Sequence, residues 1–276
     1  MPSNREAYFE ALKLNVPKAI VEFALKEVNG FSSVELTKNF DEEIRDYLFF
    51  KNAIDRYING EMIEYIFSKA FFLSTPFFVN KDVLIPRQET EQLVLRTIDL
   101  IKEMFGNKIL NIADVCTGSG CIGISIARVL TSNNYFLTDI SKEALRVAKN
   151  NTNLCSELNI KCLQGDMLDP LKGNKLDVIV CYPPYISNIA GIDEKTWKQE
   201  PHLALIAEPA TLYYEEVLKG CHPIINQKYL LAFEIGEDME EELTKLVKKY
   251  LPDSTYFFEK DIYGKTRFLF IKQESV

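Results

Sequence analysis

Between residues 109 and 250, short apolar runs alternate with longer segments whose apolar residues recur at helical spacing. This alternation is typical of a mostly parallel, doubly wound α/β sheet. Apolar runs at 256–258 and 267–271 flank Tyr263-Gly264-Lys265 and predict a terminal antiparallel hairpin. The predicted strands cover residues 109–115, 135–138, 160–163, 176–180 and 229–235, and the predicted helices cover residues 121–130, 142–155, 211–220 and 237–250.

The first 69 residues have apolar positions at helical spacing and no cluster of catalytic residue types. One predicted helix ends at Asn29-Gly30, because glycine readily adopts the left-handed conformation that follows a helix. We expect a helical domain for packing or recognition over residues 1–69, a hairpin linker over residues 70–85 and an α/β domain over residues 86–276. Thr90 is a candidate N-cap for the first helix of the α/β domain.

The composition limits the class of protein. The chain has 276 residues, 47% of them hydrophobic, which is enough for one large core or two smaller ones. A net charge of −8 argues against a broad nucleic-acid surface. The sequence contains no apolar run long enough for a transmembrane helix and no signal-peptide core at its N-terminus. Six cysteines without a C-x-x-C pair, and only two histidines, indicate reduced thiols of a cytoplasmic protein and no metal site.

A glycine-rich loop follows the first strand of the alternating region, at the edge where open α/β sheets bind ligands. Its glycines allow the backbone to approach a ligand, and the next helix offers free N–H groups. About 20 residues later, Asp139 ends a strand and can accept from ribose hydroxyls. After the next strand, Asp166 can take an adenine amine and Met167 can lie on the base. The predicted cofactor-binding residues are Asp114, Cys116, Thr117, Gly118, Ser119, Gly120, Asp139, Asp166 and Met167.

The same loop also matches the G-x-G-x-x-G pattern of dinucleotide-binding proteins, at Gly118, Gly120 and Gly123. Two features count against a dinucleotide. Asp114 suits an ammonium group better than a pyrophosphate, and the di-proline loop after the fourth strand has no role in hydride transfer. S-Adenosylmethionine carries an ammonium, a ribose and an adenine but no phosphate, so the combination favours this cofactor.

The fourth strand stops at Tyr182-Pro183-Pro184-Tyr185. Proline cannot donate to a strand ladder and restricts the residue before it, so a stiff loop must follow, with free carbonyls beside aromatic rings. This arrangement suits a small planar group with N–H donors, such as an amide or a base amine. We assign all four residues to catalysis and substrate binding, and we place Tyr182 beside the cofactor as well.

These motifs resemble those of the HemK-type glutamine-N5 methyltransferases, which modify peptide chain release factors. The family's Pro-Arg-x-Glu/Asp-Thr-Glu box, its Asp-x-Gly/Cys-Thr-Gly-Ser-Gly loop and its Asn-Pro-Pro-Tyr motif correspond to residues 86–91, 114–120 and 182–185, the last at three of four positions. Later family segments correspond to residues 200–205, 233–236 and 261–267. The resemblance implies a Rossmann-like class I methyltransferase, S-adenosylmethionine as cofactor and a release factor rather than a nucleic acid as substrate. Arg87 and Glu89 either bind substrate in the pocket or only brace the linker between the domains.

The resemblance further implies direct methyl transfer to a side-chain amide nitrogen, held by the asparagine oxygen and the first proline carbonyl, with the tyrosine ring on the amide plane. Pro183 and Tyr185 can supply the carbonyl and the ring. Tyr182 stands in the asparagine position, and its oxygen lies farther from the backbone. Loss of one such hydrogen bond costs about 2.7–4 kcal/mol, or roughly 10²–10³ in rate. Tyr182 therefore indicates impaired catalysis, a rearranged site or another substrate.

Two other functions stay open. Adenine-N6 nucleic-acid methyltransferases share the Asn-Pro-Pro-Tyr motif, although a basic groove is expected for them and the net charge here is −8. A catalytically weak protein would instead bind S-adenosylmethionine and a release factor without turnover. Binding without methylated product would identify that case.

Overall fold

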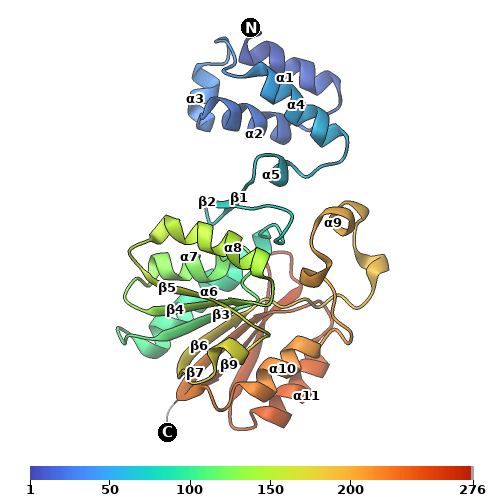
Figure 1. Cartoon of the computed structure of the whole chain (residues 1–276). Helices are drawn as coiled ribbons and strands as arrows, with labels where there is room; N and C mark the ends of the chain where they lie inside the picture. The colour runs from blue at the N-terminus through green and yellow to red at the C-terminus, as the bar shows by residue number, and fades with distance from the viewer. Residues whose placement is uncertain (275–276) are drawn as a thin grey trace. The chain divides into compact units, whose positions relative to one another are not determined.

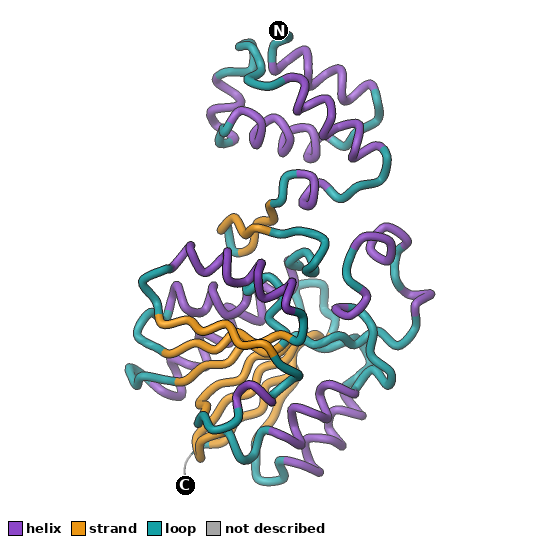
Figure 2. Tube along the Cα trace, in the orientation of Figure 1, coloured by secondary structure: helices purple, strands orange, loops and turns teal. Residues whose placement is uncertain are grey.

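The computed structural model describes residues 1–274, which form two compact units (Figures 1 and 2). Met1–Lys69 and the short segment Glu194–Gln199 make the first unit. The rest of the described chain makes the second. Every residue assigned from the sequence to the candidate site belongs to the second unit.

The first unit is helical, as the sequence pattern predicts. Ser3 and Ser32 begin α1 and α3 with capping boxes, in which each serine and a glutamate three residues later satisfy free backbone N–H groups. Gly30, with φ of 73°, ends α2. Its helices are α1 (Asn4–Lys13), α2 (Lys18–Asn29), α3 (Ser33–Lys38), α4 (Tyr47–Ile58), α5 (Ile63–Ile66) and α9 (Glu194–Gln199).

Helix α9 joins the first unit although its neighbours in sequence belong to the second. The side chain of Gln199 donates to the carbonyl oxygen of Gly60 at 2.7 Å and accepts from the backbone N–H of Met62 at 2.9 Å. The sequence pattern gave no indication of this contact, because the two segments are more than a hundred positions apart.

The second unit is built on a mixed seven-stranded sheet of order β5-β4-β3-β6-β7-β9-β8. The first five strands in this order are parallel, and β9 runs antiparallel to both β7 and β8. This confirms the predicted fold class, including the terminal hairpin. The strands are β3 (Asn111–Val115), β4 (Asn134–Asp139), β5 (Asn159–Gln164), β6 (Leu176–Cys181), β7 (Ile225–Glu234), β8 (Thr255–Lys260) and β9 (Thr266–Gln273). A separate two-stranded hairpin, β1 (Lys69–Phe72) and β2 (Thr75–Phe78), precedes it in the chain.

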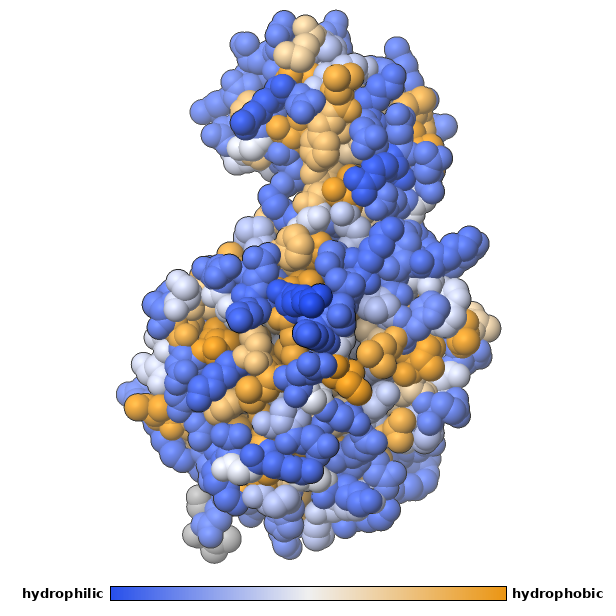
Figure 3. All heavy atoms as spheres, viewed as in Figure 1, coloured by the Kyte–Doolittle hydropathy of each residue, from blue (hydrophilic) through white to orange (hydrophobic). Residues whose placement is uncertain are grey.

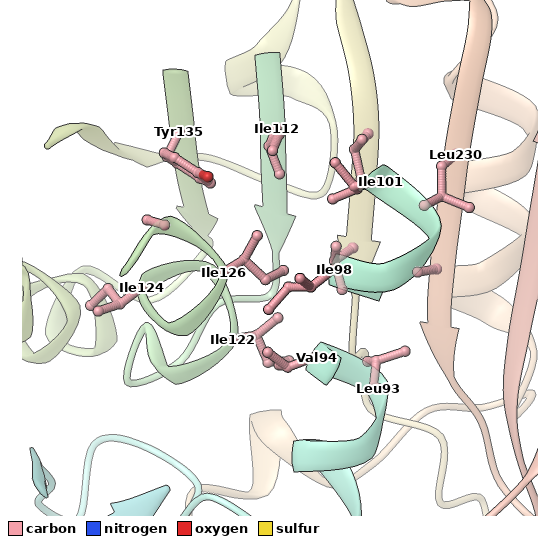
Figure 4. Close-up of a cluster of buried hydrophobic side chains, with 14 of the residues drawn as sticks. Leu93, Val94, Ile98, Ile101, Ile112, Ile122, Ile124, Ile126, Tyr135 and Leu230 are labelled. Carbon is pink, nitrogen blue, oxygen red and sulfur yellow. The ribbon is translucent and has the colours of Figure 1, made fainter. Parts of the chain in front are cut away.

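Helices cover both faces of the sheet (Figure 1). On one face lie α6 (Gln88–Phe105), α7 (Cys121–Val129) and α8 (Lys142–Asn151), and on the other lie α10 (Leu212–Gly220) and α11 (Glu240–Tyr250). Figure 4 shows Ile98 of α6 beside Ile126 of α7, and both belong to one buried cluster with Ile101 of α6 and Ile112 of β3. Each fully buried side chain of this size contributes about 1.5–3 kcal/mol, so this layer fixes the sheet edge that carries the site.

Several element ends differ from the sequence prediction. The helix predicted over residues 142–155 ends at Asn151 and continues as a 3₁₀ turn, Thr152–Cys155. Helix α11 begins at Glu240 rather than at residue 237. The prediction of Thr90 as an N-cap was wrong, because α6 already begins at Gln88. The Thr90 hydroxyl donates to the carboxylate of Glu234 instead.

Candidate active site

A cavity of about 140 Å³ lies in the second unit, where the segments that follow β3, β4, β5 and β6 meet. Segments far apart in the sequence thus form one wall, as expected at the carboxyl edge of a parallel sheet. The predicted site residues that line the cavity are Arg87, Cys116, Thr117, Gly118, Ser119, Asp139, Asp166, Met167, Tyr182 and Pro184. The other predicted site residues lie outside this lining: Asp114, Gly120, Pro183, Tyr185 and Glu89.

The glycines of the loop after β3 have different roles. Gly118 has φ of 53°, and a side chain there would meet no atom within 4 Å, so this glycine leaves the wall open. Gly120 has φ of 83°, and a Cβ atom there would lie 2.9 Å from Cδ1 of Ile124. Gly118 therefore exposes backbone to a ligand, whereas Gly120 allows the loop to pack closely on α7.

Asp114 holds this loop from behind. Its Oδ2 accepts from the Thr117 hydroxyl at 2.6 Å and from the backbone N–H of Gly123 at 2.8 Å. A Cβ atom at position 123 would lie 2.9 Å from that oxygen, so the third glycine of the pattern packs on Asp114. Burial raises the pKa of Asp114 to about 7, and Oδ1 has no hydrogen-bond partner within the described structure. This oxygen is a buried acceptor behind the cavity wall, with lone pairs that no described group uses.

Asp139 ends β4 and lines the cavity. Its Oδ2 accepts from the backbone N–H of Gly118 and its Oδ1 from that of Ser141, both at 2.9 Å. Burial raises the pKa of this carboxyl group. Each carboxylate oxygen has a second lone pair, so Asp139 can still accept from ligand hydroxyls. Cys116 and Met167 also line the cavity, with 3.7 Å between their sulfur atoms.

The di-proline loop follows β6, in which every residue is buried. Tyr182 lines the cavity and packs against the core under α6, while Tyr185 packs against the core on the opposite face of the sheet. Their ring centroids are 6.1 Å apart with planes at 31°. Gly236 makes room for the second ring, since a Cβ atom there would lie 3.0 Å from Cδ2 of Tyr185. The loop thus presents two aromatic rings from opposite sides of the sheet edge.

An ion pair braces the cavity wall. The Arg87 guanidinium donates to the carboxylate of Glu200, whose side chain is fully buried. The same carboxylate accepts from the backbone N–H of Ile85 at 3.1 Å. Burial raises the pKa of Glu200, and the charge on Arg87 opposes this effect. The segments around residues 86–91 and 200–205, which carry two parts of the sequence resemblance, are therefore neighbours in space.

Known proteins similar to this chain show its family. Residues 93–199 match the family model of the methyltransferase small domain. The chain is 34% identical over 267 residues to the release factor glutamine methyltransferase of Mycoplasma mycoides subsp. mycoides SC, with 94% of each chain covered. It is 32% identical over 260 residues to that of Bacillus cereus, with 92% of each covered. The chain belongs to the release factor glutamine methyltransferase family. A methyltransferase from Pyrococcus furiosus is 14% identical and covers 81% of this chain and 99% of its own, with a TM-score of 0.53, which shows a shared fold.

Membership of this family confirms the sequence resemblance and makes S-adenosylmethionine the cofactor. The dinucleotide-binding interpretation of the glycine pattern is therefore wrong. The roles of the individual residues stay predictions. Among the described residues no group of histidine, cysteine and carboxylate side chains is arranged to hold a metal ion. No helix in the described part of the chain is long and apolar enough to cross a membrane.

Several residues at the cavity are not predicted by the sequence motifs. Thr138 lines the cavity, and its buried hydroxyl has no hydrogen-bond partner within the described structure. Tyr213 reaches the wall from α10, which no local pattern indicates. Glu234, noted only as part of a family segment, lies buried behind the wall, where Oε2 accepts from the Thr90 hydroxyl at 2.6 Å. Its place at the carboxyl end of a central strand was the available signal.

Proposed function

We propose that this protein transfers a methyl group from S-adenosylmethionine to the side-chain amide nitrogen of a glutamine in a peptide chain release factor. One observation supports this most strongly. Tyr182 and Pro184 of the di-proline loop border the same cavity as Gly118 and Asp139 of the cofactor segments. An acceptor-rich loop beside a nucleoside-type site is what methyl transfer to an N–H group requires, and the relatives' name supplies the substrate.

The residues around the cavity fit the cofactor. The unpartnered Oδ1 of Asp114 suits its ammonium group, Asp139 its ribose hydroxyls, and Asp166 and Met167 its adenine. Cys116, Thr117 and Ser119 complete the wall around the exposed backbone of Gly118, and Gly120 keeps that wall in place. When bound, S-adenosylmethionine supplies an electrophilic methyl group on a sulfonium sulfur.

On the substrate side, the chain's task is to orient a poor nucleophile. The lone pair of an amide nitrogen is delocalised into its carbonyl group. Acceptors that hold the N–H bonds orient the nitrogen and stabilise the positive charge that develops on it. We assign one acceptor to the carbonyl of Pro183 and the stacking surface to the ring of Tyr185, with Pro184 stiffening the loop. We also assign substrate binding to Arg87, which lines the cavity, and to Glu89, which lies two positions further along the chain.

We further propose that Tyr182 slows the reaction, because the second acceptor of the family motif is an asparagine oxygen. The loss of one such preorganised hydrogen bond costs about 2.7–4 kcal/mol, or roughly 10²–10³ in rate. Purified release factor would be incubated with S-adenosylmethionine and either the native chain or Tyr182→Asn, then digested for mass spectrometry. We expect one added methyl on a glutamine, formed faster by the variant. A chain that binds both partners without product, in either form, would be a binding protein instead.

A nucleic-acid substrate is the second alternative, and the net charge of −8 disfavours it.

The helical unit is the proposed site of release-factor recognition. Figure 3 shows apolar side chains on its surface, and Val34 and Leu48 are exposed. The six cysteines are all free, which supports action in the reducing cytoplasm, where release factors act.

A further inference from the structure

The phenol of Tyr182 can be a donor or an acceptor toward the cavity, depending on where its single proton points. A substrate amide NH₂ group offers only donors. A proton aimed into the cavity would therefore oppose the substrate, whereas a proton engaged behind the wall leaves an oxygen lone pair facing the amide. The chemistry of Tyr182 thus depends on a partner behind the cavity wall.

Glu234 is placed to be that partner. It ends β7 next to the di-proline loop, its side chain is buried, and Val180 and Cys181 of β6 pair with Ala232 and Phe233 beside it. Its Oε2 accepts from the Thr90 hydroxyl at 2.6 Å. Thr90 and Tyr182 both line the cavity while Glu234 does not, so the carboxylate acts from behind. Burial raises the pKa of Glu234, and the Thr90 hydroxyl, the charge on Arg267 and the Tyr182 hydroxyl act in the opposite direction. The Tyr185 hydroxyl is a second group that the Tyr182 hydroxyl can reach.

We infer that Glu234 is a positioning residue that accepts the Tyr182 hydroxyl proton in a hydrogen bond, so that the Tyr182 oxygen accepts an N–H bond of the substrate amide. This inference rests on the proposed function. Tyr182 then recovers part of the role of the family's asparagine oxygen, although a phenol oxygen is a weaker acceptor than an amide oxygen. The substitution reduces the reaction without abolishing it, and Glu234 supports what remains.

The ionisation of Glu234 makes this arrangement sensitive to pH. A carboxylate accepts more strongly than a carboxylic acid, whose own proton also competes for acceptors. Burial raises the pKa of Glu234 to about 7, so the fraction of ionised, hydrogen-bond-accepting carboxylate increases as pH rises through neutrality. The titratable and charged groups that act on it are Glu89 of α6, Cys121 of α7, Tyr182 and Tyr185 of the di-proline loop, Tyr214 of α10 and Arg267 of β9.

A double-mutant cycle tests this role. Methylation of a release factor would be followed under single-turnover conditions for the native chain, Glu234→Gln, Tyr182→Asn and the double variant. We expect Glu234→Gln to lower the rate by about tenfold when residue 182 is tyrosine and by less than about threefold when it is asparagine. Tyr182→Phe, which keeps the ring and lacks the hydroxyl, should lower the native rate by at least as much as Glu234→Gln.

The pH profile is the second measurement and needs no variant of Glu234. The ratio of the native rate to that of Tyr182→Asn should rise between pH 6 and pH 8. Equal effects of Glu234→Gln in both backgrounds, or a flat ratio, would overturn the positioning role. Product from Tyr182→Asn together with none from the native chain would also overturn it while the proposed function stands. Absence of product from both would overturn the proposed function itself.

Discussion

The cofactor end and the substrate end that we propose for the cavity are built in different ways. At the cofactor end, backbone N–H groups and short carboxylates meet at strand ends, as Gly118 and Asp139 do. At the substrate end, longer side chains meet across elements, as Arg87 meets Glu200 and Thr90 meets Glu234. The sheet itself fixes the first set, whereas only tertiary packing fixes the second. We therefore expect changes at the proposed cofactor end to affect cofactor affinity and loop packing, and changes at the proposed substrate end to affect contacts between distant segments.

The largest effect is expected at the substrate end, from Arg87→Ala. It leaves the fully buried carboxylate of Glu200 without its counter-charge. Removal of one partner of a fully buried pair costs about 3–5 kcal/mol, and the loss here should approach the lower end because the Arg87 side chain is 34% exposed. Chemical denaturation should show this loss. Lys198→Ala is the matched control, because its pair with Glu194 is exposed and should contribute less than about 1 kcal/mol. Equal losses in the two variants would remove the distinction between the two kinds of ion pair.

Next is the pH dependence of stability. The folded state raises the pKa of Glu234 from 4.5 to about 7, so its stabilising contribution is fully present below pH 4.5 and is lost as pH rises through 7. The free energy of unfolding should decrease from pH 5 to pH 8, and this decrease should be smaller by about 2–3 kcal/mol in Glu234→Gln. Urea titrations at each pH would measure it. Glu240→Gln, at an exposed position, should leave the slope as it is; the same slope in all three proteins would contradict the expectation.

At the cofactor end, Asp114→Asn should weaken the binding of S-adenosylmethionine. The change removes the carboxylate that we propose for the ammonium group, and it puts an N–H donor into the buried site. A hydrogen bond to a charged group contributes about 1.5–3 kcal/mol, so the dissociation constant should rise by roughly 10- to 100-fold. Isothermal calorimetry would show this. Asp169→Asn, whose side chain is exposed, serves as the control. Unchanged affinity in Asp114→Asn would mean that Asp114 only holds the loop.

The smallest effect is expected from Gly118→Ala, and it sharpens the comparison within the loop. The new methyl group faces open space, so the stability cost is limited to the strained φ of 53°, about 1 kcal/mol. Gly123→Ala places a Cβ atom 2.9 Å from Asp114 and should cost about 1–3 kcal/mol by overpacking. Thermal melts would rank the two variants. A greater loss in Gly118→Ala would reverse the roles assigned to these glycines.

The difference between the two ends also explains what the sequence could predict. The alternation of apolar runs predicts the sheet, and the carboxyl ends of its strands locate Asp114, Asp139 and Asp166, since these depend on local sequence and a general topological rule. The di-proline loop follows from the backbone chemistry of proline alone. The cofactor follows from the combination of these local features.

Contacts between distant segments were not predictable in this way. Glu200 meets Arg87 across more than a hundred positions. The local preference for threonine at helix caps wrongly predicts a cap at Thr90, whose hydroxyl donates to Glu234. The packing of α9 with the helical unit likewise depends on contacts of Gln199 that no periodicity reveals. These contacts follow from tertiary packing, which overrides local preference.

The most direct test of the central claim is the rate of methyl transfer to a release-factor glutamine by the native chain and by Tyr182→Asn, measured side by side with radiolabelled cofactor and confirmed by peptide mass spectrometry. We expect both to methylate the same glutamine, the variant faster by up to roughly 10²- to 10³-fold. Equal rates would contradict the assignment of Tyr182 to the acceptor position. No methylated glutamine in either reaction would contradict the proposed activity.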